Sequence, residues 1–304
     1  MGVSKTDFGV TRDGRKASLY TIINKNGMEA VVSDFGAILV KLIVPNKDGE
    51  KADVVLGFDY LEQYEENPNF FGSTVGRSAN RIGGAAFQID GVTYHLTANE
   101  NENNLHSDFY HGFHKVLWNA DMKDRENAVV FSYNSPDGEN GFPGNLKISV
   151  TYTLKNDNSL QISYDGISDK KTIINMTNHS YFNIGCGGQA AGDVLGAQVQ
   201  IASAKYTPIN EKRLPTGEIC DVAGTAMDFR EFHDIGSRIG EDDANAQTVS
   251  GYDHNYILPG NPGEICYAAA VRDPESRRIV EVFTDMPGVQ LYTAKELVEQ
   301  GGKG

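Results

Sequence analysis

The sequence predicts an all-β fold, arranged as a sandwich of antiparallel sheets. Many short segments alternate apolar and polar residues with the period of two that a half-buried strand requires. Turn-forming pairs such as Asn26-Gly27 and Asp48-Gly49 separate these segments at close spacing. Long amphipathic helices are not evident, so we expect strands to build the core.

The expected strands follow one another along the chain, and each is rich in β-branched and aromatic residues. They cover residues 17–23, 28–32, 38–44, 87–89, 92–94, 128–133, 146–154, 159–164, 172–176, 199–201 and 279–283. Asp90-Gly91 joins two of them and predicts a compact hairpin. Short helices are expected only at residues 61–66 and 230–239.

Length and composition favour one ordinary globular domain over residues 1–304. Hydrophobic residues make up 39% of the 304 residues and charged residues 22%, which suffices for a large core without disulfides. The net charge of −14 argues against nucleic acid or an anionic membrane as partner, because both attract basic surfaces. No stretch is apolar and long enough to span a membrane, and the N-terminal residues carry no apolar run, so we expect neither a membrane span nor a secretory signal.

The cysteines point to a reducing, cytoplasmic location. Cys186, Cys220 and Cys266 are far apart and odd in number, and none belongs to a CxxC pair.

Histidine, asparagine and arginine are concentrated in a few segments. Four of the seven histidines lie between His95 and His114, where Asn103-Asn104-Leu105-His106 precedes Gly112-Phe113-His114-Lys115. Thr177-Asn178-His179-Ser180-Tyr181-Phe182-Asn183 repeats the same residue types. These side chains offer donors and acceptors for a neutral, hydroxyl-rich ligand, and histidine also moves protons near neutral pH.

These segments, in this order, resemble the aldose 1-epimerases, also called galactose mutarotases. The resemblance covers nearly the whole chain. Its other elements are Gly76-Arg77-Ser78-Ala79-Asn80-Arg81-Ile82, Tyr206-Thr207-Pro208, Leu214-Pro215-Thr216-Gly217, Asp228-Phe229-Arg230, Gly251-Tyr252-Asp253-His254-Asn255-Tyr256 and Pro287-Gly288-Val289-Gln290-Leu291-Tyr292-Thr293. It implies a large antiparallel β-supersandwich that binds sugar in a cleft on a concave sheet face.

The activity that the resemblance implies is interconversion of the α and β anomers of a free aldose such as glucose or galactose. The ring opens when a general acid protonates the ring oxygen and a general base removes the anomeric hydroxyl proton. This chemistry needs no cofactor, metal or covalent intermediate. His179 matches the family's general acid, and His106 matches the second histidine, which assists charge development at the ring or anomeric oxygen.

The resemblance also implies the sugar contacts. Asn80 and Arg81 match the pair that contacts sugar hydroxyls. Asp253 matches the aspartate that accepts hydrogen bonds from sugar hydroxyls, and Gln290 matches a further contact. Tyr181 is expected to add an aromatic edge and a hydroxyl. Arg77 is expected to be a structural ion-pair partner, although the sequence leaves open that Arg77 and Arg81 exchange these roles.

A metal site is not expected, because His106, His111 and His114 do not follow the spacing of zinc ligands. The single tryptophan, Trp118, is expected in the core. The expected partner is an aldose, and the chain is expected to act as a monomer or weak dimer.

The sequence departs from the family at the general base. In the family this is a glutamate that follows the Pro-Gly-Val-Gln segment and a glycine-rich loop. That loop begins here at Gly301-Gly302-Lys303-Gly304, while Glu296 and Glu299 precede it and lack the motif. We therefore expect residues 1–304 to lack the base and its C-terminal strand. Ser107 and Asp108 also stand where the family has glycines, a change expected to reshape the cleft rim.

Two alternatives remain open from the sequence. A non-catalytic sugar-binding or regulatory protein on the same scaffold would tolerate the loss of the base. A relative that acts on sugar phosphates would need a cluster of arginine or lysine, and Arg77 and Arg81 are too few for one.

Overall fold

The computed structural model describes residues 2–46, 48–185, 194–239, 251–261, 263–294, 297 and 302–303. Their contacts divide the chain into two compact units. Unit 1 comprises Met1–Pro45, Gly49–Phe182 and Gly301–Gly304, and unit 2 comprises Asn46–Asp48 and Asn183–Gln300. The single domain over residues 1–304 stays a prediction.

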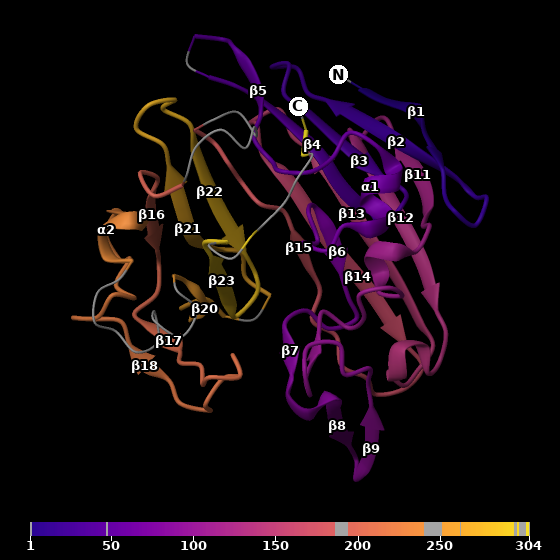
Figure 1. Ribbon diagram of the computed structural model, residues 1–304. Helices are drawn as coiled ribbons and strands as arrows, with labels where there is room; N and C mark the ends of the chain where they lie inside the picture. The colour runs from indigo at the N-terminus through magenta and orange to yellow at the C-terminus, as the bar shows by residue number, and fades with distance from the viewer. Residues whose placement is uncertain are drawn as a thin grey trace. The chain divides into compact units, whose positions relative to one another are not determined.

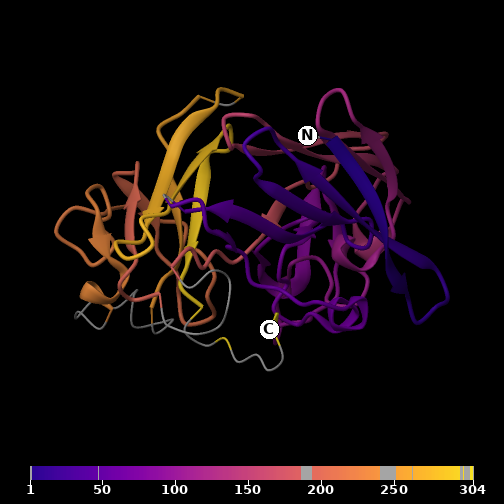
Figure 2. The same cartoon turned by 90° about the horizontal axis from the view of Figure 1, so that it is seen from above.

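Unit 1 is built from antiparallel strands that follow the chain order. One sheet is β1 (Gly2–Val10), β2 (Lys16–Ile23), β3 (Glu29–Ser33), β4 (Ile38–Pro45) and β5 (Lys51–Asp53). Another is β11 (Asn119–Lys123), β12 (Ala128–Ser135), β13 (Leu146–Leu154) and β14 (Leu160–Ser168). Figures 1 and 2 show the strands of each sheet side by side.

Short pairs of strands and short helices complete unit 1. The pairs are β6 (Ser73–Val75) with β15 (Thr177–His179), β7 (Arg81–Ile82) with β10 (Asn104–Leu105), and β8 (Ala86–Ile89) with β9 (Val92–His95). Helix α1 spans Leu61–Glu66, and 3-10 turns span Gly83–Ala85, Phe113–Lys115 and Glu139–Gly141.

The core of unit 1 lies between its two larger sheets. The rings of Tyr20 on β2 and Phe131 on β12 meet edge to face, with centroids 5.6 Å apart. The hydroxyl of Tyr152, on β13, donates a 2.8 Å hydrogen bond to the carbonyl of Ala37. Alternate residues of β13 are buried, so its period of two places one face toward the first sheet. This is the sandwich packing expected from the sequence.

Unit 2 also consists of antiparallel strands. One sheet has the order β19 (His233–Asp234), β16 (Gln198–Ile201), β21 (Cys266–Arg272) and β22 (Ile279–Thr284). The other has the order β18 (Cys220–Asp221), β17 (Lys205–Thr207), β20 (Asp253–Ile257) and β23 (Gly288–Tyr292). Helix α2 spans Ile235–Arg238.

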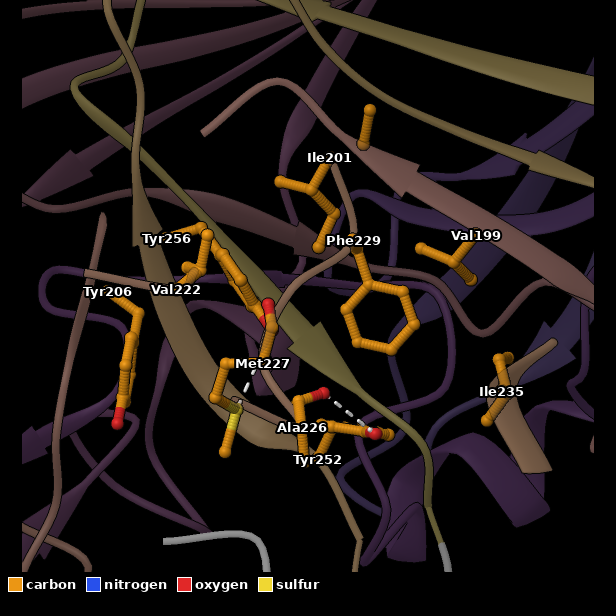
Figure 3. Close-up of a cluster of buried hydrophobic side chains, with 11 residues drawn as sticks. Val199, Ile201, Tyr206, Val222, Ala226, Met227, Phe229, Ile235, Tyr252 and Tyr256 are labelled. Carbon is orange, nitrogen blue, oxygen red and sulfur yellow. Dashed lines mark hydrogen bonds between the residues drawn. The ribbon is translucent and has the colours of Figure 1, made fainter. Parts of the chain in front are cut away.

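Aliphatic and aromatic side chains together form the core of unit 2 (Figure 3). The rings of Phe229 and Tyr252 meet edge to face at 5.0 Å. The buried hydroxyls of Tyr252 and Tyr256 donate to the carbonyls of Ala226 and Met227 at 3.1 and 3.2 Å. Burying a tyrosine hydroxyl is unfavourable without a partner, so these bonds also fix the loop between β18 and β19.

The all-β class is confirmed, and most expected strands and helix α1 are found within a residue or two of their predicted bounds. The prediction of one strand is wrong. Residues 172–176 do not form a strand: Ile174 is exposed, and Asn175 makes only an isolated bridge to Ser78 before β15 begins at Thr177. The helix expected at residues 230–239 is shorter, because β19 takes up His233 and Asp234.

Among the described residues, no helix combines the length and apolar character needed to cross a membrane. Trp118 is buried and donates its indole N–H to the carbonyl of Phe113 at 3.0 Å.

Candidate active site

Strand β15 carries His179 at its end, and β6 fixes its position. The two strands pair in the register His179 to Ser73. The carbonyl of His179 accepts a 3.1 Å hydrogen bond from the N–H of Gly72. A Cβ on Gly72 would lie 2.1 Å from the carbonyl oxygen of Leu39, and its φ is +65°. Only glycine allows this approach, so the backbone beside His179 is closely defined.

Phe70 lies between the histidines of unit 1 and was not predicted from the sequence. Its ring centroid is 4.8 Å from that of His106, 4.6 Å from His114 and 5.8 Å from His179. The residue is 4% exposed and has a φ of +58°, a left-handed conformation that costs a bulky residue about 1–2 kcal/mol. Asn67 holds this turn, since its side chain bonds both the N–H and the carbonyl of Phe71.

Strands β7 and β10 bring Asn80 and His106 together. The N–H of His106 donates to the carbonyl of Asn80 at 3.1 Å. In return, the N–H of Asn80 donates to Nδ1 of His106 at 3.0 Å. An Nδ1 that accepts an N–H carries no proton, so a neutral His106 has its proton on Nε2. The backbone of Asn80 therefore makes His106 a donor at Nε2.

His106 and His179 are neighbours. Their rings are perpendicular, with centroids 5.1 Å apart, and the ring of Tyr181 lies 5.2 Å from that of His179. Burial among aromatic rings holds the pKa of His106 well below its usual range, and the charges that His179, His114 and Arg81 can carry lower it further. His106 is therefore neutral at pH 7.

Arg81 adjoins this pair and is held by Glu100. Nε and Nη2 of Arg81 donate to the two carboxylate oxygens of Glu100 at 2.5 and 2.7 Å. The side chains are 8% and 25% exposed. Glu100 is itself fixed by backbone hydrogen bonds in both directions with Asn103, at 3.1 and 2.9 Å. No sequence signal marks Glu100 as the partner of an arginine 19 residues earlier.

In unit 2, Asp253 and Gln290 form a polar pair on neighbouring strands. Nε2 of Gln290 donates to Oδ1 of Asp253 at 2.8 Å. Asp253 lies opposite Tyr292, and Gln290 lies opposite Asn255, so these four side chains share one face of the sheet. The intervening His254 and Tyr256 are buried on the other face.

Comparison with known proteins identifies the family. A model of the aldose 1-epimerase family matches residues 18–303. A galactose mutarotase of Rattus norvegicus is 39% identical over 297 residues, which are 98% of this chain and 83% of the relative. A galactose mutarotase of Homo sapiens is 41% identical over 266 residues, 88% of this chain and 74% of the relative.

The chain belongs to the aldose 1-epimerase family. A crystal structure of a galactose 1-epimerase from Lactobacillus acidophilus aligns with a TM-score of 0.78 and 32% identity. The alignment covers 89% of this chain and 77% of that one. The resemblance seen in the sequence and the galactose mutarotase-like fold are thus confirmed.

Five of the residues expected in the sugar site lie in unit 1: His106, His179, Asn80, Arg81 and Tyr181. Asp253 and Gln290 belong to unit 2. Their roles in the reaction stay predictions. Cys186, Glu296 and Glu299 lie outside the described residues, and Cys220 and Cys266 are free thiols.

Arg77 does not form the ion pair expected of it. Its side chain is 1% exposed and donates to the carbonyls of Pro143, Gly144, Ser135 and Pro136 at 2.8 to 3.3 Å. Burial lowers its pKa. Its function in the fold is structural, as expected, but it holds a loop through backbone oxygens.

His111 and His114 do not converge with His106 on a common point. The side chain of His111 is 77% exposed and contacts Asp108. His114 is buried, and its Nε2 bonds the carbonyl of Phe109 at 3.2 Å. In the part of the chain that the structure describes, no group of three His, Cys, Asp or Glu is placed to hold a metal ion.

Ser107 and Asp108 are buried, and their expected effect on the cleft rim stays a prediction. The hydroxyl of Ser107 accepts from the N–H of Ser78 at 2.8 Å and donates to its carbonyl at 3.1 Å. Ser107 therefore fixes the segment that carries Asn80 against the segment that carries His106.

Proposed function

We propose that this chain interconverts the α and β anomers of free aldoses by general acid–base ring opening and closure. The observation that supports this most is the pair of adjacent imidazoles, His106 and His179, placed against the aromatic ring of Phe70. Binding a neutral sugar needs no second proton carrier, whereas ring opening needs a proton moved to the ring oxygen. Family membership supports the same activity.

In this proposal, His179 donates the proton to the ring oxygen as the ring opens and takes it back as the ring closes on the other face. Solvent water accepts the proton that the anomeric hydroxyl loses on opening and returns a proton on closure. Neutral His106 donates from Nε2 to an oxygen that gains negative charge, because its Nδ1 is occupied by Asn80. Asn80, Arg81 and Tyr181 hold hydroxyls near the pair. Asp253 and Gln290 bind a further hydroxyl pair, for which a carboxylate offers two acceptor oxygens. No cofactor or metal takes part.

A second candidate is a sugar-binding protein of the same family. The observation that favours it is the pair of Asp253 and Gln290, which offers hydrogen bonds to hydroxyls without a histidine proton carrier. A binding protein would use the same polar contacts and would need no base.

Polarimetry and calorimetry together separate these candidates. The optical rotation of freshly dissolved α-D-galactose is followed with and without the protein, and galactose binding is measured by titration calorimetry. The enzyme relaxes the rotation faster than the buffer blank. Binding of galactose with relaxation at the blank rate would establish the binding protein and reject catalysis.

A further inference from the structure

The ion pair between Arg81 and Glu100 bears on which sugars the site accepts. A guanidinium without a carboxylate partner binds carboxylate and phosphate groups through two parallel hydrogen bonds. In this chain, Nε and Nη2 of Arg81 already make that pair of bonds to Glu100. An anionic sugar would have to displace a carboxylate that is built into the protein.

Glu100 is well held in this position. Its backbone makes a two-way bridge with Asn103, which is 2% exposed. The Oδ1 atom of Asn103 accepts from the N–H of Gly84, at 3.2 Å, and so ties the turn to the segment that follows Arg81. The arginine side chain is 8% exposed and the glutamate 25%, so the pair is partly shielded from water and from salt.

The other arginine of the same segment does not replace the neutralised charge. Arg77 is 1% exposed and is committed to backbone carbonyls. The charge of Arg81 reaches the catalytic pair, since it contributes to the lowered pKa of His106. Glu100 is the carboxylate that pairs with Arg81 at this place, and the net charge of −14 of the whole chain gives anions no general attraction.

We propose that Glu100 is a specificity-determining residue: by neutralising Arg81 it selects neutral aldoses and rejects sugars that bear a carboxylate or phosphate. This inference rests on the proposed function, because it takes Arg81 to lie at the sugar. Glu100 acts through Arg81 and is a positioning residue.

The test compares sugars that differ mainly in charge. Galactose, galacturonate and galactose 6-phosphate are assayed by polarimetry for kcat/KM and by calorimetry for Kd, with the wild type and Glu100→Gln. Freeing the positive charge of Arg81 should raise the preference for each anionic sugar relative to galactose by about tenfold. The gain should shrink as salt is added. Glu100→Asp keeps the charge and should retain the selectivity of the wild type.

Glu126→Gln is the matched control, since it removes an exposed carboxylate in the turn between β11 and β12 and should leave the selectivity unchanged. An unchanged ratio in Glu100→Gln would overturn the inference, as would an equal change in Glu126→Gln. If the wild type shows no turnover of galactose, the proposed function fails separately, and the calorimetric ratios still decide the role of Glu100.

Discussion

The two units offer different chemistry to a sugar. In unit 1, His106 and His179 are packed against Phe70, and burial keeps His106 neutral. In unit 2, the pair of Asp253 and Gln290 lies on a polar sheet face, with Gln290 exposed. Proton transfer requires side chains whose pKa is set by their surroundings. Recognition of hydroxyl groups requires hydrogen-bond donors and acceptors with fixed orientations. We therefore expect unit 1 to govern turnover and unit 2 to govern affinity.

The largest effect is expected at His179. His179→Ala should lower kcat by roughly 10²–10⁴-fold, the usual value of a positioned general acid, with little change in galactose affinity. Polarimetry gives the rate and calorimetry the affinity. His111→Ala is the control, because its side chain is 77% exposed and should not affect the rate. Equal rates for wild type and His179→Ala would contradict the role of His179 as the general acid.

The next largest effect concerns the ring behind the histidines. Phe70→Ala should lower the free energy of unfolding by about 3–5 kcal/mol, the usual cost of deleting a buried phenylalanine, and should reduce turnover as the histidines lose their packing. Urea unfolding measures the first and polarimetry the second.

Phe70→Gly is the matched variant, because it removes the same ring and also relieves the left-handed backbone at φ +58°. It should be about 1 kcal/mol more stable than Phe70→Ala. The reverse order would contradict the strain assigned to this turn.

In unit 2, Asp253→Asn should mainly weaken binding. Losing a charged acceptor costs about 1.5–3 kcal/mol per hydrogen bond, which corresponds to roughly 10–100-fold in the Kd for galactose, with a smaller change in kcat. Calorimetry measures the Kd, and Asp221→Asn, an exposed change on β18, is the control. If Asp253→Asn lowered kcat and left the Kd for galactose unchanged, the expectation that unit 2 governs affinity would be contradicted.

The smallest effect is a dependence of stability on pH. Burial lowers the pKa of His114 to about 3. Below pH 6.5 the unfolded chain takes up a proton at this histidine that the folded chain does not, so stability falls as the pH drops from about 6.5 toward 3. The lowered pKa of His106 acts in the same direction.

His114→Gln should flatten the plot of unfolding free energy against pH by about 1.4 kcal/mol per pH unit in this range. Urea unfolding at several pH values measures the slope. An unaltered slope in His114→Gln would show that His114 does not stay neutral in the folded chain.

Much of the fold follows from local patterns in the sequence. The strand at Leu146–Leu154 and the helix at Leu61–Glu66 have the bounds expected from the alternation and length of their segments. The strand predicted at residues 172–176 is not found. The β-branched side chains of this segment suit a strand, but no neighbouring strand pairs with it along its length. Strand propensity is context-dependent, and pairing depends on tertiary structure.

Less of the site follows from sequence. The histidines, Asn80 and Arg81 are visible because they cluster in motifs. Phe70 and Glu100 are not, since their importance arises from where turns place them: Phe70 through a left-handed backbone, and Glu100 through a turn closed by Asn103. The expected ion pair of Arg77 is wrong for the same reason. The sequence shows its positive charge, but only the fold brings together the four carbonyls to which its guanidinium donates.

The most direct test of the account is the exchange of galactose anomers at equilibrium, measured by NMR saturation transfer between the α and β anomeric signals. The account predicts transfer above the buffer blank with the wild-type chain, and transfer reduced to the blank with His179→Ala under conditions where calorimetry still detects galactose binding. Equal transfer with both proteins, above the blank, would contradict the claim that the histidine pair of unit 1 carries the reaction.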